Sequence, residues 1–388
     1  MEIGSSRLVS RSVSWNASGT YLGYGASDRM ARIVALDAAS SNHREILTIA
    51  GHQQPVTKIR FHPKEETTVC EENLIHEPTA TIIWSFFYYH QGKSSCLNRL
   101  LPFSILHHFL SEQLLTAAND NSIRLWDCRQ ASQKSLGSFE AKTTVDVSWC
   151  NTMGQYMVVT ERSGRVCIYD RRQLSPRGGN LASSSTASVP RVTPVHAFHR
   201  PPLLADAAIF SPHGGEYLIA SLTERGEGMS DLGVWKWKTD NNKMVDSSKD
   251  ESIMRFPAHA GPIYTMALSQ DGKRLVTGGA DAMVGLWDTD SMICTHSFAA
   301  PTKLIRSVAI SPKDWVAVSN EENDVFVVSA STAESLGQVV ISTERGGAEE
   351  VVWHPRGFPL LACARVPLDL PHKPMPAPVV VAKLNINR

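Results

Sequence analysis

The stretch LVTGGADAMVGLWD, residues 275–288, decides the fold because its pattern recurs elsewhere in the chain. It places Thr277, Asp281 and Trp287 among strand-forming residues and ends in Trp-Asp. Residues 114–127, LLTAANDNSIRLWD, carry the same three residue types at the same spacing. Their matching residues are Thr116, Asp120 and Trp126. Two copies at one spacing indicate an internal repeat, which has to be recognised before any single segment is interpreted.

The match extends upstream of both stretches. In GHQQPVTKIRF and AHAGPIYTMAL, a histidine stands nine residues before the end of an alternating apolar segment. These histidines are His52 and His259. Each repeat therefore contains His, Thr, Asp and Trp in one order, and chance rarely produces four residue types in the same order twice.

Weaker copies fill the rest of the chain. Segments such as SVSWNASG, DVSWCNTMG and VVWHPRG end a strand-like run with an aromatic residue and a turn signal. Short β-branched runs separated by Gly, Pro, Asn and Asp are typical of all-β structure. The shortest spacings between equivalent points of the repeat are about 42–43 residues, the length of a four-stranded propeller blade. The sequence therefore predicts one all-β domain over residues 1–388, a single seven-bladed β-propeller with insertions.

The His, Thr, Asp and Trp set has two interpretations. It could be a catalytic Thr-His-Asp constellation, or it could be a hydrogen-bonded network that stabilises a blade. In the second case the carboxylate, imidazole, hydroxyl and indole N–H satisfy one another in a buried setting, where an unmatched group costs about 1–3 kcal/mol. We favour the network because the set occurs twice. We find no phosphate-binding loop, nucleophile elbow or zinc helix, and we expect neither enzymatic activity, nor a cofactor, nor a metal.

Composition narrows the classes of partner. Lys plus Arg and Asp plus Glu are equal at 38 each, so the net charge is near zero. The electrostatic field of the whole protein therefore does not favour nucleic-acid binding. The seven cysteines include no C-x-x-C pair, which suits a reducing compartment. The chain begins without a signal-peptide pattern, and no apolar run reaches the ~20 residues of a membrane span. We expect no membrane partner and no small-molecule substrate.

The sequence also resembles a known family. GH…LLTAANDNSIRLWDCR and AH…LVTGGADAMVGLWDTD resemble WD40 repeats. The order of repeats is similar to that of the THO complex subunit 3 family, the WD-repeat subunits of the THO/TREX assembly that couples transcription to mRNA export. The stretches that carry this likeness are GGADAMVGLWDTDSMIC and AEEVVWHPRGFPLLACA. The resemblance implies a nuclear scaffold that contacts other THO/TREX subunits and touches RNA indirectly or weakly.

Two other roles stay open at this point. A substrate receptor of a cullin-type ubiquitin ligase reaches its adaptor through a W-D-x-R motif, and IRLWDCR places Arg129 in that position. The alternative for Arg129 is a solvated cation at the end of a strand, which we favour because W-D-x-[KR] is frequent in WD40 repeats. A direct RNA-binding propeller is the weakest idea, because no Lys/Arg stripe is interleaved with aromatic residues.

Three insertions interrupt the predicted repeat. The first, residues 64–112, has the aromatic and leucine-rich centre TIIWSFFYYHQGKSSCLNRLLPFSILHHFL, which would form a sticky surface if exposed. It is either a docking segment or a retained intron, and we favour the intron because the flanks join into one normal repeat. The second, residues 171–194, is rich in Ser, Pro and Gly and predicts a mobile loop. The third, residues 364–378, is Pro-rich and has to lie outside the central strands.

Closure of the ring raises a last question. Propellers usually close when one terminus supplies the outer strand of the blade that the other terminus builds. By the repeat register, only about five residues precede the first unit, fewer than a strand of ~5–6 residues and its connection need. We therefore expect either an incomplete closure or a chain start farther upstream, and we favour the second.

Overall fold

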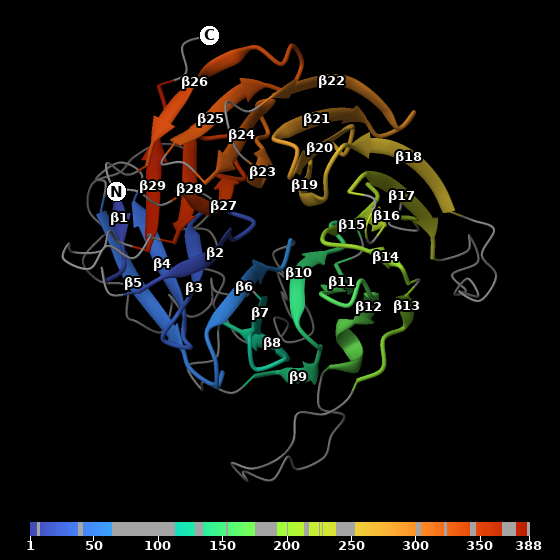
Figure 1. Ribbon diagram of the computed structural model, residues 1–388. Helices are drawn as coiled ribbons and strands as arrows, with labels where there is room; N and C mark the ends of the chain where they lie inside the picture. The colour runs from blue at the N-terminus through green and yellow to red at the C-terminus, as the bar shows by residue number, and fades with distance from the viewer. Residues whose placement is uncertain are drawn as a thin grey trace, which may run out of the picture.

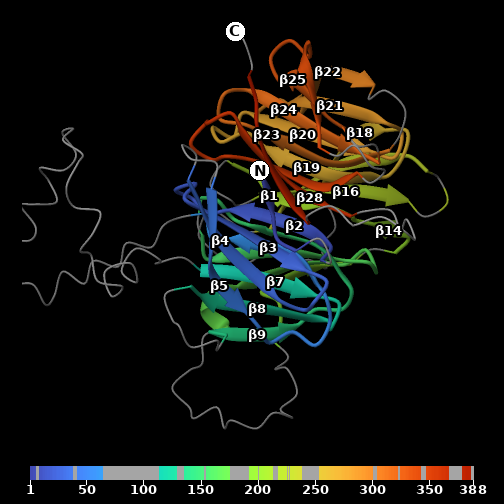
Figure 2. The same ribbon diagram turned by 90° about the vertical axis from the view of Figure 1, so that its left-hand side faces the viewer.

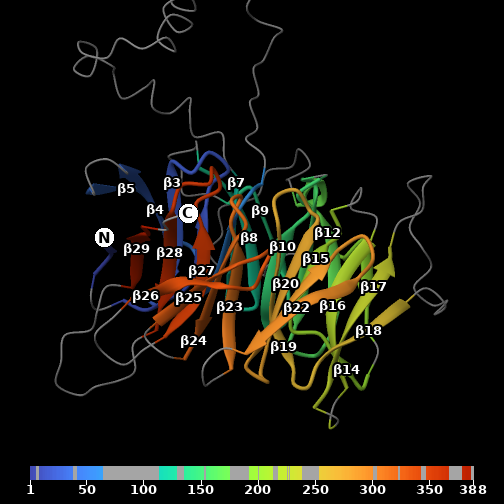
Figure 3. The same cartoon turned by 90° about the horizontal axis from the view of Figure 1, so that it is seen from above.

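Seven antiparallel sheets stand as blades around a central axis (Figure 1). In the view from above, the strands of all blades lie within one layer, so the blades form a single ring (Figure 3). The predicted all-β, seven-bladed propeller is confirmed. The computed structural model describes residues 1–5, 8–37, 42–63, 113–128, 135–152, 154–174, 192–199, 201–212, 217–224, 226, 228–237, 253–299, 304–321, 324–341, 347–366 and 378–385.

Each blade contains an inner, a second, a third and an outer strand, and the blades are numbered along the chain. The inner strands are β2 (Ser10–Trp15), β6 (Val56–Phe61), β10 (Thr144–Trp149), β15 (Ala208–Phe210), β19 (Ile263–Leu268), β23 (Ile305–Ile310) and β27 (Ala348–Trp353). The second strands are β3 (Tyr21–Ala26), β7 (Gln113–Ala118), β11 (Tyr156–Glu161), β16 (Tyr217–Glu224), β20 (Arg274–Gly279), β24 (Trp315–Asn320) and β28 (Leu360–Arg365).

The third strands are β4 (Ala31–Asp37), β8 (Ser122–Asp127), β12 (Val166–Asp170), β17 (Ser230–Lys236), β21 (Met283–Asp288), β25 (Asp324–Ser329) and β29 (Val379–Lys383). The outer strands are β5 (Asn42–Ile49), β9 (Gly137–Glu140), β13 (His196–Phe198), β18 (Ile253–His259), β22 (Ile293–Ala299), β26 (Ser335–Val340) and β1 (Glu2–Ile3). Blade 4 has an additional strand, β14 (Leu203–Leu204), which pairs with β16.

The hydrophobic core is divided among the interfaces between blades. The described residues form seven buried clusters, one at each interface between neighbouring blades. At the closing interface, Val13 and Leu22 of blade 1 pack with Ala362 and Val379 of blade 7. Every blade buries both of its faces against neighbouring blades. The sequences of its strands are therefore continuous apolar runs rich in Val, Ile and Leu.

The ring closes through a very short strand. β1 pairs with β29, so the N-terminal residues complete the last blade (Figures 1 and 2). Ile3 is 1% exposed, and Glu2 accepts a hydrogen bond from the buried guanidinium of Arg365 at 2.9 Å. The expectation that five leading residues are too few for a closing strand was therefore wrong. Two residues suffice because a buried side chain and an ion pair reinforce the ladder.

The predicted insertions map onto gaps between strands. Residues 64–112 lie outside the described residues, and the strands that flank them, β6 and β7, pair directly within blade 2. The predicted loop 171–194 differs at its start, because Arg171–Gln173 form a short 3-10 helix, η3, and Leu174 is buried beside Gly137. Residues 364 and 365 belong to β28, and 367–377 lie outside the described part. No helix among the described residues is long and apolar enough to cross a membrane.

Candidate functional site

The four predicted residues of blade 5 come together in one chain of contacts, which we call the blade-5 brace (His259, Thr277, Asp281 and Trp287). His259 Nδ1 lies 3.0 Å from Asp281 Oδ1, and His259 Nε2 lies 2.8 Å from Thr277 Oγ1. The indole N–H of Trp287 donates to Thr277 Oγ1 at 3.0 Å. A carboxylate only accepts, so Nδ1 carries the proton toward Asp281, and Nε2 then accepts from the Thr277 hydroxyl.

The blade-2 brace consists of His52, Thr116, Asp120 and Trp126 and has the same geometry. His52 Nδ1 lies 3.0 Å from Asp120 Oδ2, and His52 Nε2 lies 2.7 Å from Thr116 Oγ1. Trp126 Nε1 donates to Thr116 Oγ1 at 2.8 Å. Burial opposes ionisation of Asp120, but hydrogen bonds from His52 and Ser122 prevail and hold the pKa of this carboxyl well below its usual range.

Sequence elements explain why the four residues meet. The histidine lies at the end of the outer strand of the preceding blade, His259 as the last residue of β18 and His52 just after β5. The aspartate lies in the turn between the second and third strands, and Thr and Trp lie on those two strands. Ala282 and Asn121, directly after the aspartates, adopt φ of 61° and 58°. The positive φ aims each carboxylate back at the backbone N–H two residues on, as in an Asx turn. Each brace therefore also connects two blades.

The burial of the two threonines favours a structural network over a catalytic set. Thr116 and Thr277 are each 0% exposed, and each hydroxyl oxygen already accepts an indole N–H. A nucleophile has to reach a substrate, and both hydroxyls are buried and engaged by an indole N–H. The arrangement instead satisfies four polar side chains internally, which is how buried networks specify a unique packing.

Blade 4 carries an incomplete version of the brace. Ala220 pairs with Gly233 as Thr277 pairs with Gly285 in blade 5, so Ala220 takes the threonine position. Trp235 takes the tryptophan position, and its buried indole nitrogen has no hydrogen-bond partner among the described residues. The hydroxyl that accepts this N–H in blades 2 and 5 is missing here.

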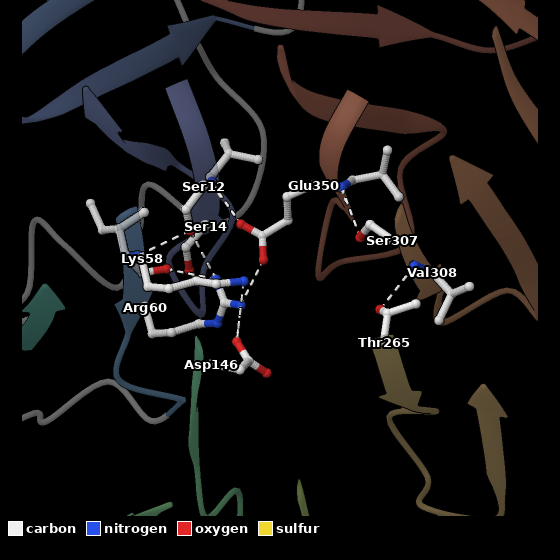
Figure 4. A network of polar contacts seen from close by, with 12 residues as sticks. Ser12, Ser14, Lys58, Arg60, Asp146, Thr265, Ser307, Val308 and Glu350 are labelled. Atoms are coloured by element: carbon white, nitrogen blue, oxygen red, sulfur yellow. Dashed lines mark hydrogen bonds and ion pairs between the residues drawn. The ribbon is translucent and has the colours of Figure 1, made fainter. Parts of the chain in front are cut away.

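A second polar network lines the central channel (Figure 4) and was missed by the sequence reasoning. Arg60 Nη2 lies 2.6 Å from Glu350 Oε1 and 3.3 Å from Asp146 Oδ1, and Lys58 Nζ also lies 3.3 Å from Asp146. These side chains come from the inner strands of blades 2, 3 and 7 and border a cavity of about 360 Å³. Burial opposes the charge on Glu350, but Arg60 and Lys58 prevail and lower its pKa.

Glu350 belongs to a series of contacts that connects successive blades. Thr265 Oγ1 accepts the Val308 N–H at 3.2 Å, and Ser307 Oγ accepts the Val351 N–H at 3.2 Å. Two further contacts continue the series, the Val13 N–H to Glu350 Oε2 at 2.9 Å and the Ile59 N–H to Ser12 Oγ at 3.0 Å. One inner-strand side chain thus holds the backbone of the next blade at four consecutive interfaces, from blade 5 around to blade 2.

The predicted partner-contact residue and possible metal ligands remain to be placed in the structure. Arg129 lies outside the described residues. Within the part of the chain that the structure describes, no group of three His, Cys, Asp or Glu side chains could hold a metal ion. The polar contacts described for the two braces and the channel connect neighbouring blades.

Comparison with known proteins agrees with this geometry. The family described as "WD domain, G-beta repeat" matches residues 250–288, which contain the blade-5 brace. THO complex subunit 3 of Arabidopsis thaliana is 20% identical over 354 residues, covering 91% of this chain and 85% of that protein. WD repeat-containing protein AAC3 of Dictyostelium discoideum is 21% identical over 373 residues, 92% of this chain but 61% of that protein. Eukaryotic translation initiation factor 3 subunit I of Drosophila pseudoobscura pseudoobscura is 25% identical over 299 residues, 74% of this chain and 79% of that protein. The protein thus carries a WD40 repeat within a seven-bladed propeller.

Proposed function

We propose that this protein is a non-enzymatic scaffold subunit of a THO/TREX-type complex that acts in co-transcriptional mRNP assembly and nuclear mRNA export. The observation that carries the proposal is the similarity to THO complex subunit 3 of A. thaliana, which runs through 91% of this chain and 85% of that protein. A match of that extent covers most of the ring rather than a single repeat.

The construction of the ring suits a scaffold. Buried clusters at all seven interfaces and the contacts between inner strands fix the blades relative to one another. A rigid body presents several surfaces in fixed directions and loses little conformational entropy when a partner binds. Its partners, on this proposal, are the other THO/TREX subunits.

Contact with RNA is indirect or weak on this proposal. The formal net charge is +0, and affinity for phosphate backbones depends on the number of cations that contact them. The Arg60 and Lys58 side chains in the channel are already paired with Asp146 and Glu350. Arg306, which also lines the channel, is paired with Glu321. The described side chains of the channel therefore offer no unpaired positive stripe to an RNA strand.

The role as a ubiquitin-ligase receptor is not favoured. It depends on Arg129, which lies outside the described residues.

Purification of a tagged chain from nuclear extract, with and without ribonuclease, tests the proposal. The expected result is recovery of THO subunits in both samples, because protein contacts hold the assembly. Recovery of ubiquitin-ligase adaptors without THO subunits would contradict the proposal. Loss of the THO subunits after ribonuclease would show that RNA, not this ring, makes the connection.

A further inference from the structure

The outer edges of blades 5 and 6 differ from ordinary solvent-facing strands. β22 and β26 are exposed along nearly their whole length, and neither contains Asp, Glu, Lys, Arg or Pro. Ile293 on β22 is 62% exposed and Val340 on β26 is 65% exposed. An edge strand has backbone N–H and C=O groups without a neighbouring strand, so natural proteins usually protect such edges with charge, proline or shortness.

The other five outer strands show that protection. β5 carries Arg44 and Glu45, and β18 carries Arg255 and Pro257. β9, β13 and β1 have only four, three and two residues. The two unprotected edges therefore stand apart within the same ring, and they belong to neighbouring blades on its periphery (Figure 1).

A groove lies between these two edges. A cavity of about 490 Å³ is lined there by uncharged residues, among them Phe298, Phe326, Val328, Ala333 and Gly337. No atom of the described residues beyond its chain neighbours lies within 4 Å of the point where a Cβ on Gly337 would stand. This part of the structure therefore leaves the groove open at that strand. A volume in the ~300–1,000 Å³ range is enough to hold a bulky side chain of a partner.

Charge complementarity limits what can occupy this surface. A charged side chain entering the groove would lose its hydration and find no opposite charge among the lining residues. An uncharged extended segment avoids that cost, and its backbone can pair with the edge of β26 while alternate side chains face the ring.

We propose that the edge of β26 binds an uncharged, extended segment of a partner protein by strand addition, with one apolar side chain of that segment in the groove beside Phe298 and Phe326. The inference deepens the scaffold role and rests on it, but it does not depend on which complex contains the protein.

Photo-cross-linking tests the surface directly. The probe is p-benzoylphenylalanine, which replaces Val340 in the full chain. In the matched control the same photoreactive residue replaces Asn42 on β5, the outer strand that carries charged residues. The expected result is a cross-link from position 340, but not 42, to an uncharged segment of another protein. A cross-link to a second copy of this chain, a cross-link to a charged segment, or no cross-link at position 340 would overturn the proposal.

Introducing a positive charge on the uncharged edge of β26 gives the second measurement. Val340→Lys and its control Asn42→Lys add the same charge at exposed positions, so both variants should keep the wild-type melting temperature. We expect Val340→Lys alone to lower recovery of the cross-linked partner at least about tenfold. Equal recovery with both variants contradicts strand addition at β26 and leaves the scaffold proposal standing. Failure of the wild-type chain to recover THO subunits contradicts the scaffold proposal instead.

Discussion

The substitution Asp281→Ala removes the centre of the blade-5 brace. The Asp281 carboxylate accepts from His259 Nδ1 at 3.0 Å and from the backbone N–H groups of Ala260 at 2.9 Å and Met283 at 3.1 Å. Alanine can accept none of these bonds with its side chain. The three donors therefore lose their partner while the remaining strand geometry stays possible.

The expected loss follows from the burial of each donor. The His259 side chain is 1% exposed, so its N–H cannot recruit water and bears the full penalty of an unmatched buried group, about 1–3 kcal/mol. The Ala260 and Met283 contacts lie at an exposed and a half-buried place, where water replaces much of the lost bond. Together we expect a loss of about 2–4 kcal/mol, a large part of the ~5–15 kcal/mol that stabilises a typical protein.

Denaturant unfolding of the purified chain measures this loss, with circular dichroism and tryptophan fluorescence as two readouts. With an unfolding entropy of about 2.1 cal/mol/K per residue over 388 residues, the melting temperature should fall by about 2–5 °C. Asp290→Ala, at an exposed position in the same blade, is the control and should cost under about 0.5 kcal/mol. If Asp281→Ala is as stable as its control, the bracing role is refuted.

Three further predictions follow from the polar contacts. Asp120→Ala should cost a similar 2–4 kcal/mol in the blade-2 brace, read in the same unfolding assay, and equal stability would contradict the equivalence of the braces. Ala220→Ser should give the orphaned Trp235 indole an acceptor and raise stability by about 0.5–1.5 kcal/mol, whereas a loss would mean that the hydroxyl cannot reach it. The folded-state pKa of Glu350 is lowered, so its ion pair with Arg60 stabilises the ring above about pH 4.3, and this contribution is lost as the pH falls through the folded pKa. In acid titrations monitored by fluorescence, Glu350→Gln should therefore lose less stability than wild type between about pH 5 and pH 3, and an unchanged slope would contradict the assignment.

Local spacing predicted both braces because their residues recur in one order along the chain. Thr and Trp occupy neighbouring strands of one blade, Asp lies in the turn between them, and that turn fixes the distances among the three residues. The histidine lies just before the same blade, so the whole set is local in the propeller and visible in a single repeat.

The channel network could not be found in that way. Arg60 and Glu350 are separated by 290 positions, and only closure of the ring brings their inner strands near one another. A charged residue inside a strand such as VTKIRF or AEEVVW reads as a solvent-facing position under period-two alternation. One sequence signal could have revealed this network. The same inner-strand position carries charges of opposite sign in different blades, at Lys58, Asp146 and Glu350.

The closing strand and the start of the loop after β12 were misjudged for a related reason. The two residues of β1 are too few for any propensity argument, and their pairing depends on Ile3 entering a cluster formed by the opposite end of the chain. Leu174 likewise joins the cluster between blades 2 and 3 from a segment whose composition indicates a loop. Tertiary burial outweighs local composition at both places.

Reconstitution gives the most direct test of the scaffold role. The full chain is mixed with the purified remaining THO subunits in the presence of ribonuclease and passed over a size-exclusion column. The account predicts that the chain elutes with the other subunits in a fixed ratio, and that it does so without RNA. Elution of a folded chain by itself, while the other subunits assemble without it, would contradict the account.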